Sequence, residues 1–260
     1  FPLLATNEES LYAQLSMAVR THQRMLGKRP RGIWLPECGY KPGVDRLLRE
    51  FGIEYFILDS HGLLNAEPRP KYGVHSPIRT PEGPAAFARD YESSKQVWAA
   101  EEGYPGDPAY REFYRDAGFD VHEPHIRKLQ HAGIPTFTGL KYHRITGKTE
   151  WKESYHPGWA RERAAEHAGH FMFNRQHQIN WLTSFFDRPP IILAPYDAEL
   201  FGHWWFEGPQ WIDFLLRKMA HDQNDIKTIT PSEYLDRYSD LQPASPPECS
   251  WGAGGFHEVW

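Results

Sequence analysis

Two short segments carry the residues whose types and spacing could do chemistry. The first has Glu37 at the exit of a short apolar run, Trp34-Leu35-Pro36-Glu37-Cys38-Gly39-Tyr40. In the second, Asp197 follows the strongest apolar run of the chain, in Tyr196-Asp197-Ala198-Glu199-Leu200-Phe201-Gly202-His203-Trp204-Trp205. Two carboxyl groups on different strand ends suit glycosyl transfer, because one can attack the anomeric carbon while the other protonates the leaving oxygen. A retaining mechanism would place these carboxyl groups roughly 5–5.5 Å apart.

Each acid also has a purely structural interpretation. Glu37 could cap the helix that follows its strand. Asp197 could belong, with His203, to a buried polar cluster that closes one end of a barrel. The catalytic interpretation needs an apolar wall or a neighbouring negative charge, which keeps a general acid protonated near neutral pH. Aromatic residues beside Asp197 could form that wall: Tyr196, Trp204 and Trp205.

The surrounding pattern predicts short apolar strands that alternate with helices. Strands are expected over residues 32–37, 53–58, 136–142, 190–195 and 226–229. Helices are expected from a capping box at Thr6-Asn7-Glu8-Glu9, over 42–51, 124–132, 159–185 and 209–220, and from 231 onward. Residues 59–123, rich in Pro, Gly and Tyr, are expected to form mainly loops. This alternation indicates a parallel α/β sheet or barrel, in which chemistry lies on the loops after the strands.

The composition is that of an ordinary globular chain. The 260 residues are 40% hydrophobic and 24% charged with a net charge of -5, so there is no basic footprint for nucleic acid. No apolar run is long enough to span a membrane. Cys38 and Cys249 form no CxxC motif, which predicts a reducing, cytoplasmic compartment. The aromatic share of 15% suits either a large aromatic core or a surface on which sugar rings stack.

Neither a metal ion nor a cofactor is predicted. His122 and His125 are three residues apart, and three more histidines lie along one expected helix: His167, His170 and His177. Such spacings are common by chance, and no HExxH motif is present. The chain also has no Walker loop, no GxGxxG fingerprint and no GxSxG elbow, which argues against a nucleotide cofactor and a serine hydrolase.

The two acidic segments resemble two signature motifs of glycoside hydrolase family 57, and within it the chain is similar to the 1,4-alpha-glucan branching enzymes. Further stretches support the resemblance: Phe87-Ala88-Arg89-Asp90, Glu92-Ser93-Ser94-Lys95-Gln96-Val97-Trp98, Gly103-Tyr104-Pro105-Gly106-Asp107-Pro108, Tyr110-Arg111-Glu112-Phe113-Tyr114-Arg115-Asp116, Ser250-Trp251-Gly252 and Glu258-Val259-Trp260. Together these motifs extend over essentially the whole chain.

The resemblance implies a (β/α)7 TIM-like barrel and a retaining mechanism. By this resemblance, Glu37 is expected to be the nucleophile and Asp197 the general acid/base. Residues that match glucan-holding or cleft-lining positions are Arg89, Trp98, Gly106, Trp251 and Trp260. His203 is expected to support the Asp197 loop beside the substrate, or else to belong to the core.

Parts of the family pattern have no counterpart in these residues, namely an N-terminal strand with a His-Gln-Pro motif and a C-terminal helical domain. We therefore expect an incomplete barrel over residues 1–240, followed by a linker and the start of the C-terminal region over 241–260. Activity is accordingly expected of the complete protein. Residues 60–72 match a loop that in the family helps to choose transfer over hydrolysis, and here the loop is short.

Three functions are compatible with this resemblance. The first is a branching enzyme that cleaves an α-1,4 linkage and forms an α-1,6 branch in a glycogen-like α-glucan. The second is an amylase or a 4-α-glucanotransferase of the same family, which would form no 1,6 linkages. The third is a non-catalytic glucan-binding relative, against which the presence of both Glu37 and Asp197 argues.

Overall fold

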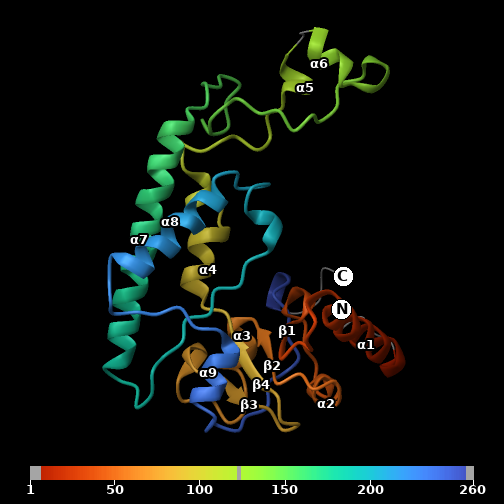
Figure 1. Cartoon of the computed structure of the whole chain (residues 1–260), viewed down its shortest axis with the longest axis vertical. Coiled ribbons are helices and arrows are strands. Elements are labelled where there is room, and N and C mark those ends of the chain that lie inside the picture. Colours follow the sequence, from red (N-terminus) through yellow and green to blue (C-terminus); the bar gives the residue numbers. More distant parts are fainter. Residues whose placement is uncertain (1–6, 122–123, 256–260) are drawn as a thin grey trace. The chain divides into compact units, whose positions relative to one another are not determined.

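The computed structural model describes residues 7–121 and 124–255, which form two compact units. Unit 1 comprises residues 1–91, 179–194 and 228–260, and unit 2 comprises residues 92–178 and 195–227. Figure 1 labels helices and strands of both units. The expected boundary at residue 240 stays a prediction.

Unit 1 is built on a small sheet with helices around it. Its strands are β1 (Gly32–Trp34), β2 (Tyr55–Leu58), β3 (Ile78–Arg79) and β4 (Ala85–Ala88), in the order β1-β2-β4-β3. Strands β1, β2 and β4 are parallel, and β3 is antiparallel to β4. Its helices are α1 (Glu8–Leu26), α2 (Val44–Glu50), α3 (Ser60–Leu64) and α9 (Pro231–Arg237), with short 3₁₀ turns η1 (Pro36–Cys38), η2 (Gly73–His75) and η6 (Ala253–Gly255).

Side chains alternate between two buried faces of this sheet. Phe56 and Leu58 of β2 pack in one cluster with residues of α1, α2 and α3, such as Leu15 and Leu48. Ile57, the residue between them, packs in a second cluster with residues of α9. Strands buried on both faces are typical of parallel α/β folds. The expected α/β class is therefore confirmed, whereas the four-stranded sheet by itself is not a closed (β/α)7 barrel.

The regular elements of unit 2 are all helices or 3₁₀ turns among its described residues. It contains α5 (Ala117–Asp120), α6 (Pro124–Lys128) and α8 (Gly208–His221), and all but an end of α4 (Tyr91–Trp98) and of α7 (Pro157–Thr183). Its turns are η3 (Tyr104–Gly106), η4 (His131–Gly133) and η5 (Ala198–Leu200). Three alanines at four-residue spacing on α7 are fully buried: Ala160, Ala164 and Ala168. They share a core with Trp205 and Trp211, so small residues on α7 leave room for large rings from the other elements.

Several expected elements differ in the structure. Within the expected capping box Thr6-Asn7-Glu8-Glu9, the N-cap of α1 is Asn7, whose side chain accepts a hydrogen bond from Ser10 N at 2.8 Å. Residues 136–142, 190–195 and 226–229 form no strand. The expected loop region 59–123 contains β4, which lies between β2 and β3 in the sheet.

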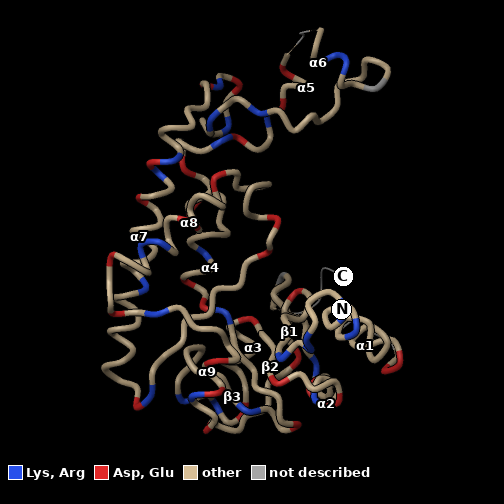
Figure 2. The backbone as a smooth tube through the Cα atoms, in the orientation of Figure 1, with Lys and Arg blue, Asp and Glu red and all other residues tan. Residues whose placement is uncertain are grey.

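Charged residues of both signs are spread over the chain. Figure 2 shows Lys and Arg interspersed with Asp and Glu along the backbone of each unit. Among the described residues, no helix is both long enough and apolar enough to span a bilayer.

Candidate active site

Glu37 lies in a strained turn directly after β1. Its backbone has φ 59° and ψ 20°, and Cys38 follows with φ 52°. Left-handed conformations cost residues with a Cβ about 1–2 kcal/mol each, and such strain concentrates at functional sites. The turn is closed by Cys38 N, which donates to Leu35 O at 3.0 Å, and by Gly39 N, which donates to Pro36 O at 2.9 Å. Together these bonds fix the direction of the half-buried Glu37 side chain.

Trp251 contacts Glu37 through both its backbone and its side chain. Trp251 N donates to Glu37 O at 2.9 Å, and the indole Nε1 donates to Glu37 Oε2. The indole ring also meets Trp34 edge to face, with ring centroids 5.3 Å apart. A donor on one carboxylate oxygen holds the orientation of that carboxylate, which is what a nucleophile requires.

Arg89 follows β4 and lies over the face of Trp251. Its guanidinium carbon is 5.2 Å from the centre of the indole ring, within cation–π distance. Its Nε donates to Asp59 Oδ1 at 2.5 Å, and both side chains are largely buried. The predicted site residues Glu37, Arg89 and Trp251 are therefore brought together in unit 1.

The topology explains why these side chains meet. Glu37, Asp59 and Arg89 follow β1, β2 and β4, which are parallel neighbours in the sheet. The carboxyl ends of parallel neighbours lie at one edge, where α/β folds place their chemistry. Sequence patterns did not indicate Asp59. Its position directly after the apolar strand Tyr55–Leu58 is the signal that could have found it.

Asp197 lies in unit 2, at the start of η5. It is half-buried, and its carbonyl accepts a hydrogen bond from Leu200 N at 3.2 Å. The neighbouring Tyr196 donates its hydroxyl to Ser93 O at 3.0 Å, which anchors the segment to α4. Trp205 is almost fully buried in the core of unit 2. Because Glu37 belongs to unit 1, the convergence of the two carboxyl groups stays a prediction.

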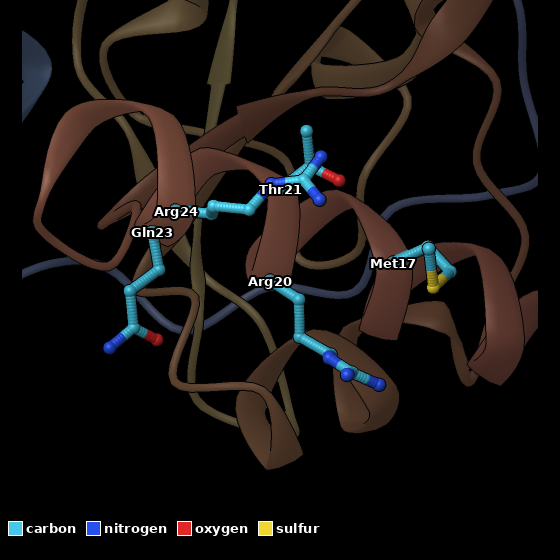
Figure 3. A pocket seen from close by; sticks show the side chains of 5 residues that line it. All are labelled: Met17, Arg20, Thr21, Gln23 and Arg24. Carbon is cyan, nitrogen blue, oxygen red and sulfur yellow. The ribbon is translucent and has the colours of Figure 1, made fainter.

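The remaining predicted residues have different surroundings. Trp98, at the end of α4, is half-buried against the core of unit 2. His203 is exposed and meets Phe113 edge to face at 5.4 Å, so it is not a core residue. Trp260 lies outside the described residues. A hollow on α1 is lined by Met17, Arg20, Thr21, Gln23 and Arg24, and no predicted site residue lines it (Figure 3).

Gly106 has a packing role that is independent of any ligand. A Cβ at this position would lie 1.8 Å from the carbonyl oxygen of Ala100. We expect Gly106→Ala to lower the free energy of unfolding by about 1–3 kcal/mol, the usual cost of overpacking, as measured by urea denaturation. Gly158→Ala is the matched control, because a Cβ there would meet nothing within 4 Å in the first turn of α7. Equal stability of the two variants would contradict this packing role.

Both cysteines are buried as free thiols. Burial raises the pKa of Cys38 and of Cys249 to about 12. We expect neither thiol to react with an aromatic disulfide reagent at pH 8 until the protein unfolds, because only the thiolate is reactive. Above pH 8.5 the unfolded thiols lose protons that the folded ones keep, so stability should fall as pH rises toward 12. Rapid labelling of the folded protein at pH 8, detected by peptide mapping, would contradict this expectation.

Two of the histidines of α7 contact tyrosines. His167 Nδ1 is 2.8 Å from the hydroxyl of Tyr110, and His170 Nδ1 is 2.8 Å from that of Tyr104. Burial lowers the pKa of His167 to about 4. Among the described residues, no three His, Cys, Asp or Glu side chains are grouped as metal ligands. His122 lies outside the described residues.

The chain matches the family model for glycosyl hydrolase family 57 over residues 1–178. This match covers more than half of the chain and includes Glu37 and Arg89. The chain belongs to glycosyl hydrolase family 57. The resemblance seen in the sequence is thereby confirmed, and the small mixed sheet of unit 1 is part of a family 57 fold.

Relatives and solved structures agree with this assignment. A 1,4-alpha-glucan branching enzyme of Thermococcus kodakarensis is 35% identical over 100% of this chain and 40% of its own length. The α-amylase AmyC of Thermotoga maritima has a TM-score of 0.90 at 45% identity, covering 97% of this chain and 49% of that one. A branching enzyme of Pyrococcus horikoshii has a TM-score of 0.84 at 36% identity, covering 100% and 47%. The chain thus spans less than half the length of these relatives.

Proposed function

We propose that the complete protein is a 1,4-alpha-glucan branching enzyme that works by a retaining mechanism. The observation that carries the proposal is the arrangement at the strand ends, where Trp251 donates to the carboxylate of Glu37 and Arg89 lies over the indole ring. An acid held in this way, in a family of glycosyl hydrolases, suits a nucleophile. Whole-chain similarity to proteins named branching enzymes supports the choice of reaction.

In the first half of the reaction, Glu37 attacks the anomeric carbon of an α-1,4-linked glucan. The bond to the 4-oxygen breaks, and Asp197 gives its proton to that oxygen. The non-reducing fragment remains on Glu37 as a covalent ester with inverted configuration. Arg89 and Trp251 are suited to bind the glucose unit, since a guanidinium donates to sugar hydroxyls and an indole face packs on the sugar ring.

In the second half, the 6-hydroxyl of another glucan attacks the ester. Asp197, now a carboxylate, takes the proton of this hydroxyl, and the second inversion restores the α configuration. Water that reached the ester would instead complete a hydrolysis. Aromatic surfaces that exclude water therefore favour transfer over hydrolysis.

The decisive experiment is linkage analysis of amylose treated with the complete protein. A branching enzyme creates α-1,6 branch points with little increase in reducing ends. New reducing ends without new α-1,6 linkages would contradict a branching activity and indicate an amylase. Amylose that binds without turnover would support the non-catalytic alternative.

A hydrolase is the second candidate, and one observation favours it. A structure with a TM-score of 0.90 and 45% identity to this chain belongs to a protein named as an α-amylase. The ratio of new branch points to new reducing ends separates the two activities in a single digest.

Cytoplasmic location and a role in glycogen synthesis belong to the same proposal. The two cysteines are free thiols, as is usual in reducing compartments. The expected partner is an α-glucan such as amylose, amylopectin or glycogen, with no metal ion or cofactor in the reaction.

A further inference from the structure

A short segment near the C-terminus carries Trp251 to Glu37. We define the Trp251 segment as residues 249–255. It folds on itself, since Ser250 N donates to Gly255 O at 3.0 Å and Gly255 N donates to Gly252 O at 2.9 Å. At its start, Tyr40 and Cys249 exchange two backbone hydrogen bonds of 2.9 and 3.0 Å. The segment is thus attached to the turn that bears Glu37.

The other side of the Trp251 segment rests on α3. His61 Nε2 is 2.8 Å from the carbonyl oxygen of Gly255, at the far end of the segment. At the near end the packing is equally close, because a Cβ at Gly62 would lie 2.4 Å from Cys249 Sγ. Residues of α3 therefore hold the segment at both ends.

Asp59 contacts both Arg89 and His61, the two side chains that reach the Trp251 segment. Its Oδ1 accepts from Arg89 Nε at 2.5 Å, and Arg89 covers the face of Trp251. Its Oδ2 lies 3.3 Å from His61 Nδ1, so the same carboxylate orients the imidazole that reaches Gly255. The Asp59 side chain is only 12% exposed, so these contacts are little weakened by solvent.

We propose that Asp59 and His61 are positioning residues that hold the Trp251 segment in place and thereby orient the carboxylate of Glu37. The proposal deepens the proposed function and rests on it for the role of Glu37. Neither residue needs to touch substrate. Asp59 acts through Arg89 on the face of Trp251, and His61 acts through Gly255 on the backbone of the segment.

The first test is amide hydrogen exchange in the complete protein. We expect Asp59→Asn and His61→Phe each to speed exchange of the Ser250 and Trp251 amides about tenfold or more, because their local opening becomes easier. Exchange in β2 should not change, which shows that the variants are folded. Asp236→Asn is the matched control, because it removes a carboxylate that pairs with an arginine of the same unit, Arg31, on the exposed surface. Unchanged exchange across residues 249–255 in both variants would overturn the proposal, whatever the activity.

The second test is kinetic. On amylose, Asp59→Asn should lower kcat roughly 10- to 100-fold, the effect of misplacing a reacting group by about 1 Å, with KM changed much less. In a Trp251→Phe background, the same substitution should have a clearly smaller further effect, because the part of its action that passes through Arg89 to the indole ring is already lost. If the kcat losses of Asp59→Asn and Trp251→Phe simply multiply in the double variant, the proposal is overturned. If the wild-type protein has no activity on amylose while exchange responds as expected, the proposed function fails and the positioning role stands.

Discussion

Replacing Glu37 by glycine is expected to abolish glucan transfer while leaving the fold intact. Loss of the nucleophile should reduce turnover of amylose by about four orders of magnitude or more. Glycine accepts φ 59° without strain, which should add about 1 kcal/mol to the free energy of unfolding relative to Glu37→Ala. Initial rates and urea denaturation measure the two effects separately.

Azide tests the chemical role of Glu37 directly. In Glu37→Gly, azide can occupy the vacated space and displace fluoride from an α-maltosyl fluoride. The product should be a β-glycosyl azide, inverted relative to the substrate, which NMR identifies. Near-normal branching by Glu37→Gly, or by Glu37→Ala, would remove Glu37 from the mechanism.

Asp197→Asn is expected to have the second-largest effect, and one that depends on the leaving group. With amylose the variant should lose about 10²–10⁴-fold in rate, because nothing protonates the departing 4-oxygen. With α-maltosyl fluoride, which needs no proton to leave, formation of the glycosyl-enzyme should be much less impaired. Burst kinetics of fluoride release measure this step.

Azide again provides the control. In Asp197→Gly, Glu37 still forms the covalent intermediate, so azide should give an α-glycosyl azide with retained configuration. The two glycine variants are thus distinguished by opposite anomers from one substrate. Equal losses on amylose and on the fluoride in Asp197→Asn would contradict a general acid/base role.

Sequence patterns located the elements whose residues are periodic or capped. Helix α7 was expected over 159–185 and extends over Pro157–Thr183. Helix α1 begins at Glu8, inside the expected capping box, and its left-handed C-cap is Gly27. These signals are local, because capping and helical spacing depend on residues within one or two turns.

Strand assignments were less reliable, because a strand needs a partner. Strand β4 is Ala85-Ala86-Phe87-Ala88, and alanine is a weak strand former, so the sequence did not indicate it. Pairing with β2 and burial on both faces create this strand. In contrast, residues 136–142 have the composition of a strand, yet they form no ladder, and Phe137 and Leu140 are exposed.

The sequence by itself determined the family, because the family motifs are continuous stretches of residues. It also determined the acid after β1 and the turn that holds it, because proline and glycine restrict or permit the backbone conformation of their immediate neighbours. The tertiary structure alone decided that Asp59 and His61 belong with Glu37, Arg89 and Trp251. His61 and Gly255 are 194 residues apart, and Glu37 and Trp251 are 214 apart. Contacts over such separations depend on which strands pair in parallel, and strand pairing is set by the packing of the whole unit rather than by local sequence.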